Sequence, residues 1–303
     1  MSDGWSDARR WLTLAGLSVA VAALFLLSVT TGAAGVPIGA ALAAVWDGLA
    51  GRAQSSTAAS IVWNWRLPGT ITAVVAGAAL AVAGAQMQTL FRNPLAGPDV
   101  LGVSSGASLG VALLVLASAG APTAFDKLAG SLGPWALVAA AGAGAMSVLL
   151  LALALARSIR DPVTLLVLGL MLGSLTTGAV GLLVSFSSQD RLQAYVAWTL
   201  GSFAGSWENL RVFAPTALVL TVAACLGGKT LNALQLGPDY ARSLGVRVHL
   251  AVGLLLGSAA LLTGSVTAFC GPVAFLGVAT PHVARALLGG GAHRWLLPAA
   301  ALA

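Results

Sequence analysis

The chain has few charged side chains: only 8% of its 303 residues are Asp, Glu, Lys or Arg. A soluble domain carries about 25% charged residues, so this sequence cannot cover a water-exposed surface with charge. Hydrophobic residues make up 58% of the chain and fall into runs long enough to cross a bilayer. The composition excludes a soluble globular protein. It predicts an all-α, polytopic membrane protein whose residues 1–303 form a single transmembrane domain.

Cysteine and histidine are scarce as well. Cys225 and Cys270 are the only cysteines, which argues against a disulfide framework, and no metal-ligand spacing is present. The three histidines, at positions 249, 282 and 293, fall near the ends of late apolar runs and are interpreted as loop or interfacial residues. We therefore expect no bound cofactor and no metal in this chain. The net charge of +6 is spread one or two residues per loop, which argues against nucleic-acid binding.

Acidic residues are missing from the middle of the apolar runs. All nine are predicted in loops or at helix ends. Ion-coupled carriers usually keep a carboxylate at mid-membrane, where a charge is costly and is retained for function. An ion-coupled secondary transporter or a channel without ATPase partners is therefore the alternative interpretation, and the less favoured one.

Apolar runs of about 20 residues predict the transmembrane helices. We expect eight complete helices and the start of a ninth at Leu296: Trp11–Thr31, Leu67–Phe91, Val100–Ala117, Trp135–Ala156, Val163–Phe186, Val212–Leu226, Val248–Thr267 and Pro272–Leu288. Ten loop Arg and Lys residues then fall on the side of the N-terminus and five on the other. This asymmetry predicts a cytoplasmic N-terminus in the cell (inner or plasma) membrane.

Two short motifs resemble catalytic signatures but lack their context. Gly102-Val103-Ser104-Ser105-Gly106 matches a nucleophile elbow, yet it opens a membrane helix with no histidine nearby, and Ser104 or Ser105 suits a helix N-cap. Gly227-Gly228-Lys229-Thr230 ends like a phosphate loop but follows a membrane helix rather than a strand. The chain is therefore not expected to be an enzyme or to hydrolyse ATP itself.

Two polar segments interrupt the apolar runs. The first is a firmly specified turn with Arg92, Asn93 and Pro94, followed by a helix start at Gly102, Ser104 and Gly106. The second, Lys229–Arg247, predicts two short helices outside the bilayer, separated by Gly237-Pro238 and stopped by Gly245. Leu236, Tyr240, Ala241 and Leu244 of this segment are expected to fit a groove on a soluble partner, the alternative being an ordinary interfacial loop.

Four motifs, in order and at matching spacing over about residues 60–303, resemble one family. They are Arg66-Leu67-Pro68, GAALAVAGAQMQTLFRNPLAGPDVLGVSSGAS at 77–108, LGPDYARSLGV at 236–246 and CGPVAFLGVATPHVARALLGGGAHRWLLPAAAL from Cys270. They resemble the permease subunits of ATP-binding-cassette (ABC) importers for iron–siderophores, haem and cobalamin, the type II importers. The resemblance implies ten transmembrane helices, of which this sequence holds eight and the start of a ninth.

The same resemblance implies the partners and the sites. The permease pairs as a homodimer or with a related subunit, two cytoplasmic ATPase subunits bind ATP, and an extracytoplasmic binding protein delivers the ligand. It assigns ATPase coupling to Leu231, Leu236, Gly237, Pro238, Asp239, Ala241, Arg242, Leu244 and Gly245. The pathway is expected along Val163–Phe186, with Thr164, Ser174, Thr176 and Thr177 as candidates. The family often has R-x-P-R where this chain has Arg66 and then Gly69, so binding-protein docking is expected to rest on Arg66 and Arg52.

Overall fold

The computed structural model describes residues 7–303 apart from 33, 53–55, 117–134, 159–161 and 290–291. The described residues form helices and no strand. Before the turn at Arg92 these are α1 (Asp7–Thr30), α2 (Ile38–Leu49), α3 (Thr57–Ile61), a π-helical turn η1 (Val62–Arg66) and α4 (Leu67–Leu90). A 3-10 turn η2 (Pro98–Leu101), α5 (Val103–Leu116), α7 (Trp135–Ser158), α8 (Pro162–Ser185) and α9 (Gln189–Thr199) follow. The rest are α10 (Trp207–Leu226), α11 (Gly228–Gln235), α12 (Pro238–Ser243), α13 (Val248–Cys270), α14 (Leu276–Leu288) and α15 (His293–Leu302).

Each predicted transmembrane run coincides with a helix, and six helical stretches among the described residues are long and apolar enough to cross a membrane. The multi-pass architecture is therefore confirmed. Two of the expected helices are shorter than predicted: α5 starts at Val103, after a left-handed Gly102, and α14 starts at Leu276. The short helices α2 and α9 were not predicted.

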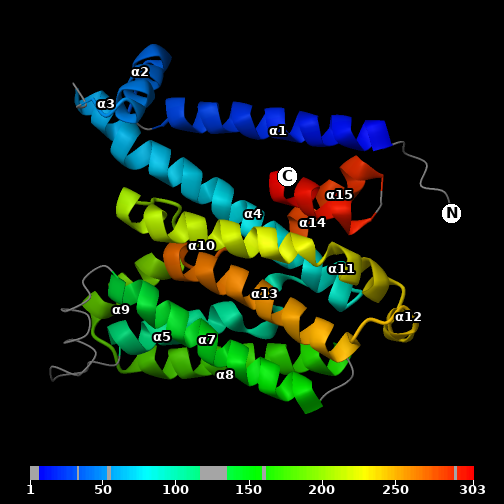
Figure 1. The fold of residues 1–303 in the computed structure, drawn as a ribbon. Helices are drawn as coiled ribbons and strands as arrows, with labels where there is room; N and C mark the ends of the chain where they lie inside the picture. The colour runs from blue at the N-terminus through cyan, green and yellow to red at the C-terminus, as the bar shows by residue number, and fades with distance from the viewer. Residues whose placement is uncertain (1–6, 33, 53–55, 117–134, 159–161, 290–291) are drawn as a thin grey trace.

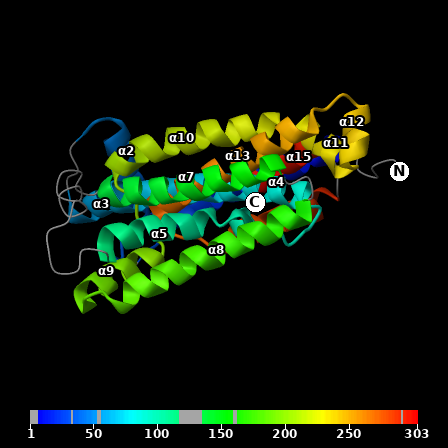
Figure 2. The same cartoon turned by 90° about the horizontal axis from the view of Figure 1, so that it is seen from below.

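Helix α4 lies at the centre of the bundle, with α10, α13, α14 and α15 packed around it (Figures 1 and 2). Its sequence is apolar on all sides, which is the pattern of a helix with no solvent-facing stripe. Its backbone approaches that of α14 directly, because a Cβ built on Gly84 would lie only 1.7 Å from the carbonyl oxygen of Gly277. The two backbones thus touch directly, which only small residues permit.

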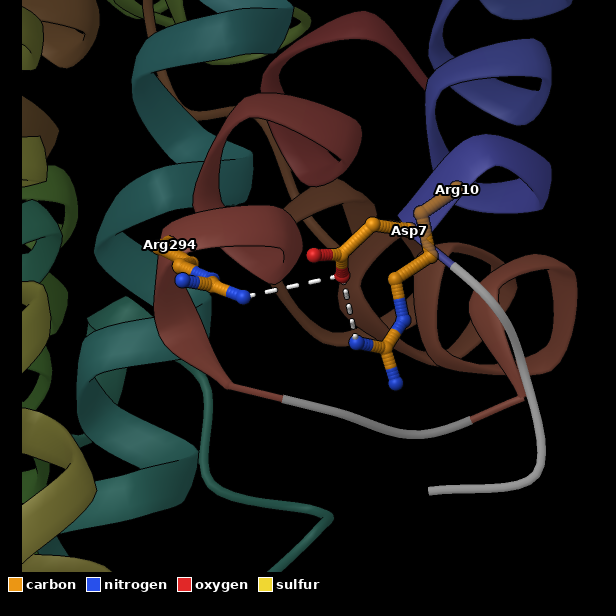
Figure 3. A network of polar contacts seen from close by, with 3 residues as sticks. All are labelled: Asp7, Arg10 and Arg294. Carbon is orange, nitrogen blue, oxygen red and sulfur yellow. Dashed lines mark hydrogen bonds and ion pairs between the residues drawn. The ribbon is translucent and has the colours of Figure 1, made fainter. Parts of the chain in front are cut away.

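Helix α1 lies along one side of the bundle, and most of its side chains are exposed (Figure 1). Its first turn is fixed to α15 by ionic and aromatic contacts. Asp7 lies between Arg10, at 3.5 Å, and Arg294, at 3.6 Å, as Figure 3 shows. Beside them the rings of Trp11 and Trp295 meet edge to face at 5.0 Å between centroids.

The two ends of the bundle differ in charge. The start of α1, the end of α4, α11, α12 and the start of α15 gather at one end (Figure 1). This end carries basic residues at positions 9, 10, 92, 229, 242, 247 and 294. The opposite end holds α2, α3 and α9, and carries Arg52, Arg66 and Arg191. These described members of the two sets of basic residues that the sequence separates therefore lie at opposite ends.

Candidate functional site

The most distinctive surface is formed by α11 and α12, which follow α10 at the basic end (Figure 1). Glycine and proline set the boundaries of these two short helices. Gly237 separates them with φ +125°, a conformation that side-chain-bearing residues rarely adopt, and Pro238 occupies the first turn of α12. Gly245, at φ +81°, lies just beyond the end of α12. Residues 228–245 thus form the two-helix element that the sequence predicts.

One side of this element is buried against the bundle. Leu231, Leu234 and Ala241 are almost inaccessible to solvent and belong to the main hydrophobic core. Leu231 and Ala241 therefore hold the two helices in place. Neither side chain reaches the surface, so any part that these two residues have in ATPase coupling is through holding the helices and not through direct contact with a partner.

The other side exposes large apolar groups. Leu236 is 66% exposed and Leu244 is 58% exposed, with Tyr240 between them in sequence, also exposed. Asp239 and Arg242 form an ion pair on the same surface. An apolar cluster with a polar rim outside the membrane-spanning helices is the usual mark of a protein–protein interaction site. We refer to Leu236, Tyr240 and Leu244 as the α11–α12 surface.

The turn after α4 packs against the α11–α12 element. Arg92 adopts the left-handed conformation at φ 47°, and its Nη2 donates a hydrogen bond to the carbonyl oxygen of Leu234, 3.4 Å away. The same guanidinium lies against Gly237, where a Cβ would come within 2.7 Å of Nη2. Asn93 accepts a hydrogen bond from the Leu95 backbone, and the Pro94 carbonyl oxygen accepts one from His282. Both segments stand out in the sequence, but nothing in it predicts that they touch.

The hairpin continues into α5 through tight glycine contacts. Gly102 has φ +73° and approaches the backbone of Gly173 on α8, and Gly106 packs against Gly144 on α7. The sequence suggested Ser104 as the N-cap of α5, but the helix already begins at Val103, so Ser104 lies inside it. Its hydroxyl instead donates to Asp99 and lies 3.2 Å from the Thr267 hydroxyl oxygen, so no histidine base contacts it.

Helix α8, the expected pathway helix, leaves a broad face uncovered. Thr164, Ser174 and Thr177 are exposed, and Ser174 and Thr177 donate hydrogen bonds to carbonyl oxygens of their own helix. Thr176, the fourth candidate, does not share this face. It is buried and lies on the opposite side of α8, because a step of two residues turns a helix by about 200°.

The two arginines expected to dock a binding protein have partners within the chain. The Arg66 guanidinium donates to the carbonyl oxygens of Thr30, at 3.0 Å, and Ala34, and so covers the end of α1. Arg52 is exposed and lies 3.2 Å from Asp47. Gly69 packs against the backbone at Phe203, which would lie 3.2 Å from an added Cβ. A larger residue at position 69 therefore requires that backbone to shift.

His293 is buried, so its interpretation as a loop or interfacial residue is wrong: only 1% of its surface is exposed. Its Nδ1 lies 2.7 Å from Oδ1 of Asn232 on α11, and its Nε2 lies 2.8 Å from the hydroxyl of Thr89 on α4. Burial, helped by the nearby positive charge of Arg285, lowers the pKa of His293 to about 4. The imidazole is therefore neutral at physiological pH.

Comparison with known proteins places this arrangement in a family. The profile of the FecCD transport family matches residues 20–303. The chain belongs to this family. Its curated relatives include the hemin transport system permease protein HmuU of Yersinia pestis, 37% identical over 80% of this chain and 71% of the relative. The vitamin B12 import system permease protein BtuC of Serratia proteamaculans is 37% identical over 97% of this chain and 81% of its own length.

A third relative is the ferric enterobactin transport system permease protein FepD of Escherichia coli, 37% identical over 94% of this chain and 84% of its own length. Among solved structures, a metal-chelate type ABC transporter in an inward-facing conformation matches with a TM-score of 0.80 and 26% identity. That match covers 95% of this chain and 85% of the transporter chain. The chain is thus a permease of the type II ABC importer family, as the sequence motifs had indicated.

Proposed function

We propose that this chain is the membrane subunit of an ATP-driven importer that carries an iron–siderophore complex into the cytoplasm. Relatives named for hemin, vitamin B12 and ferric enterobactin support the wider class, because each of these is a bulky metal chelate. Haem and cobalamin are therefore the related substrates to compare with siderophores. The chain itself performs no bond chemistry and contributes a route through the membrane.

The observation that carries the proposal is the α11–α12 surface. Its exposed leucines and tyrosine lie at the basic end of the bundle, which the positive-inside rule assigns to the cytoplasm together with the N-terminus. An ATPase subunit that buries Leu236 and Leu244 removes apolar area from water, worth about 1.5–3 kcal/mol for each fully buried leucine. Two ATPase subunits would bind two such permeases, one on each copy.

The exposed face of α8 is the proposed contact with the second permease subunit and the substrate route. Large apolar residues such as Leu170, Met171 and Leu175 alternate there with Thr164, Ser174 and Gly178. A second copy of this chain facing this surface would enclose a pathway lined by both apolar and hydroxyl groups. ATP binding would draw the two ATPases together, move α11 and α12, and shift the helices around that pathway.

Docking of an extracytoplasmic binding protein would use the opposite end. Arg52 and Arg66 lie there, and Arg52 remains exposed beside its carboxylate partner. Because Arg66 already bonds to the end of α1, we propose that Arg52 provides the accessible charge and that Arg66 shapes the surface around it.

Uptake measurements test the proposal. Cells with the complete transport system are given radiolabelled iron(III) hydroxamate, iron(III) catecholate, haemin and cobalamin, each with its binding protein. We expect accumulation of an iron–siderophore that stops when ATP is depleted while proton and sodium gradients are maintained. Accumulation that persists without ATP and collapses with the ion gradient would instead establish the ion-coupled alternative.

A further inference from the structure

One of the contacts that join the α11–α12 element to the bundle is a small polar cluster. Thr89 comes from the last turn of α4, Asn232 from the middle of α11, and His293 is the first residue of α15. The three residues are far apart in sequence and meet at one point. His293 and Thr89 are more than nine-tenths buried there. No step of the proposed transport cycle described above uses them.

The donors and acceptors in this cluster can be assigned. The backbone N–H of His293, which can only donate, lies 2.8 Å from Oδ1 of Asn232, so the atom at this position must be the amide oxygen and not the amide nitrogen. Since the same oxygen also faces Nδ1, the proton of the neutral imidazole sits on Nδ1. Nε2 is then an acceptor and lies 2.8 Å from the Thr89 hydroxyl, whose one proton is shared between Nε2 and the carbonyl oxygen of Ala85 on the same helix, also 2.8 Å away. The backbone N–H and both ring nitrogens of His293 thereby have partners.

The end of α4 that holds Thr89 is joined to several other helices. Gln86 accepts a hydrogen bond from Ser258 on α13 and donates one to the Ala224 carbonyl oxygen on α10, at 2.8 and 3.4 Å. Gln88 accepts one from Arg285 and donates one to the Val278 carbonyl oxygen, both on α14. A displacement of α4 at this level therefore acts on α10, α13 and α14 together. His293 extends this set of contacts to α15 and α11.

We propose that Asn232, His293 and Thr89 are positioning residues that transmit movement of α11 to α4 and α15. The proposal rests on the proposed function, since it needs an ATPase that moves the α11–α12 element. Leu231 and Leu234 also hold α11, but apolar contacts are non-directional and permit sliding. Hydrogen bonds are directional: two of them, from the backbone N–H and Nδ1 of His293 to Asn232, join α11 to α15, and one between His293 and Thr89 joins α15 to α4. The bond from Arg92 to the Leu234 carbonyl oxygen is longer, at 3.4 Å. Without the bonds of this cluster, less of the movement of α11 reaches α4.

Matched valine substitutions test the proposal. Thr89→Val removes the hydroxyl that contacts His293. Thr263→Val is the control, because Thr263 is equally buried on α13 and its hydroxyl donates within its own helix, to Ala259. The importer is reconstituted in proteoliposomes with its ATPase subunits, its binding protein and the chelate identified by the uptake panel. Basal ATP hydrolysis and chelate transported per ATP are then measured for each variant.

For Thr89→Val we expect an intact ATPase complex, basal hydrolysis as in the wild type, and about tenfold less chelate per ATP, within the range known for coupling residues. Thr263→Val is expected to match the wild type, and Thr89→Ser, which keeps the hydroxyl, to restore coupling. Asn232→Leu removes the acceptor at the other end of the cluster. It provides a second measurement of chelate transported per ATP if Thr89→Val does not fold. Asn232→Asp keeps the acceptor oxygen and is expected to retain coupling.

Equal coupling in Thr89→Val, Asn232→Leu and the wild type would overturn the proposal. Equal losses in Thr89→Val and Thr263→Val would also overturn it, because any missing buried hydroxyl would then have the same effect. Failure of the proposed function has a different signature. In that case the wild-type chain itself forms no ATPase complex and transports no chelate.

Discussion

The contact between α4 and α14 gives a quantitative prediction about the fold. Gly84 meets the carbonyl oxygen of Gly277, which would lie 1.7 Å from a Cβ. Non-bonded heavy atoms pack at roughly 3.5 Å, so Gly84→Ala requires the two helices to separate by about 1.5–2 Å. Overpacking of this kind lowers the free energy of unfolding by about 1–3 kcal/mol. We expect a value at the upper end, because the atom that the new Cβ meets belongs to the backbone and cannot rotate away.

Gly77 supplies the matched control, since it lies on the same helix with no atom within 4 Å of an added Cβ. Gly77→Ala is expected to stabilise α4 by up to about 1 kcal/mol through helix propensity. The two variants should therefore differ by about 2–4 kcal/mol. Thermal unfolding in detergent, followed by tryptophan fluorescence, measures the difference. A Gly84→Ala protein that unfolds at or above the temperature of Gly77→Ala would refute the close approach of α4 and α14.

Three further predictions concern individual side chains. The pKa of His293 is about 4 in the folded protein and 6.5 in the unfolded chain. The unfolded state therefore takes up a proton as the pH falls from 6.5 to about 4, and up to about 3 kcal/mol of stability is lost across this window. Unfolding measured between pH 4 and 8 should show this slope in the wild type and lose it in His293→Gln. Arg66→Met should expose the carbonyl oxygens at the end of α1 and lower the unfolding temperature by a few degrees, about 1–3 kcal/mol, whereas Arg52→Met should change it by less than about 0.5 kcal/mol. Arg294→Gln should leave Asp7 with Arg10 alone. Added salt should then increase hydrogen exchange of residues 8–12, in the first turn of α1, less than it does in the wild type. Equal salt sensitivity of the two proteins would contradict this.

Residues that act locally could be predicted from sequence. Gly237-Pro238 and Gly245 set the limits of α12 because glycine and proline restrict or permit particular backbone angles within a few residues. The exposed position of Leu236 and Leu244 was also predicted correctly. Ala241 was placed on the wrong side because a helix of six residues is too short for its apolar spacing to define a face.

Residues that act through distant contacts could not be predicted. His293 reads as a helix-end residue in sequence, and its partners lie 61 and 204 positions away. Arg92 and Gly237 each mark a turn, yet nothing local shows that one packs on the other. Thr176 differs from Ser174 and Thr177 only by its angle around α8, and α8 is apolar on every side, so the sequence gives no face to the helix.

The central claim is that the α11–α12 surface binds an ATPase, and co-purification tests it most directly. The tagged chain is purified with its ATPase subunits as wild type, Leu236→Asp, Leu244→Asp and Leu49→Asp. Leu49 is the control, an equally exposed leucine at the opposite end of the bundle. We predict that the wild type and Leu49→Asp retain the ATPase subunits, while Leu236→Asp and Leu244→Asp lose them and remain folded. Retention by all four proteins, or by none, would contradict the account.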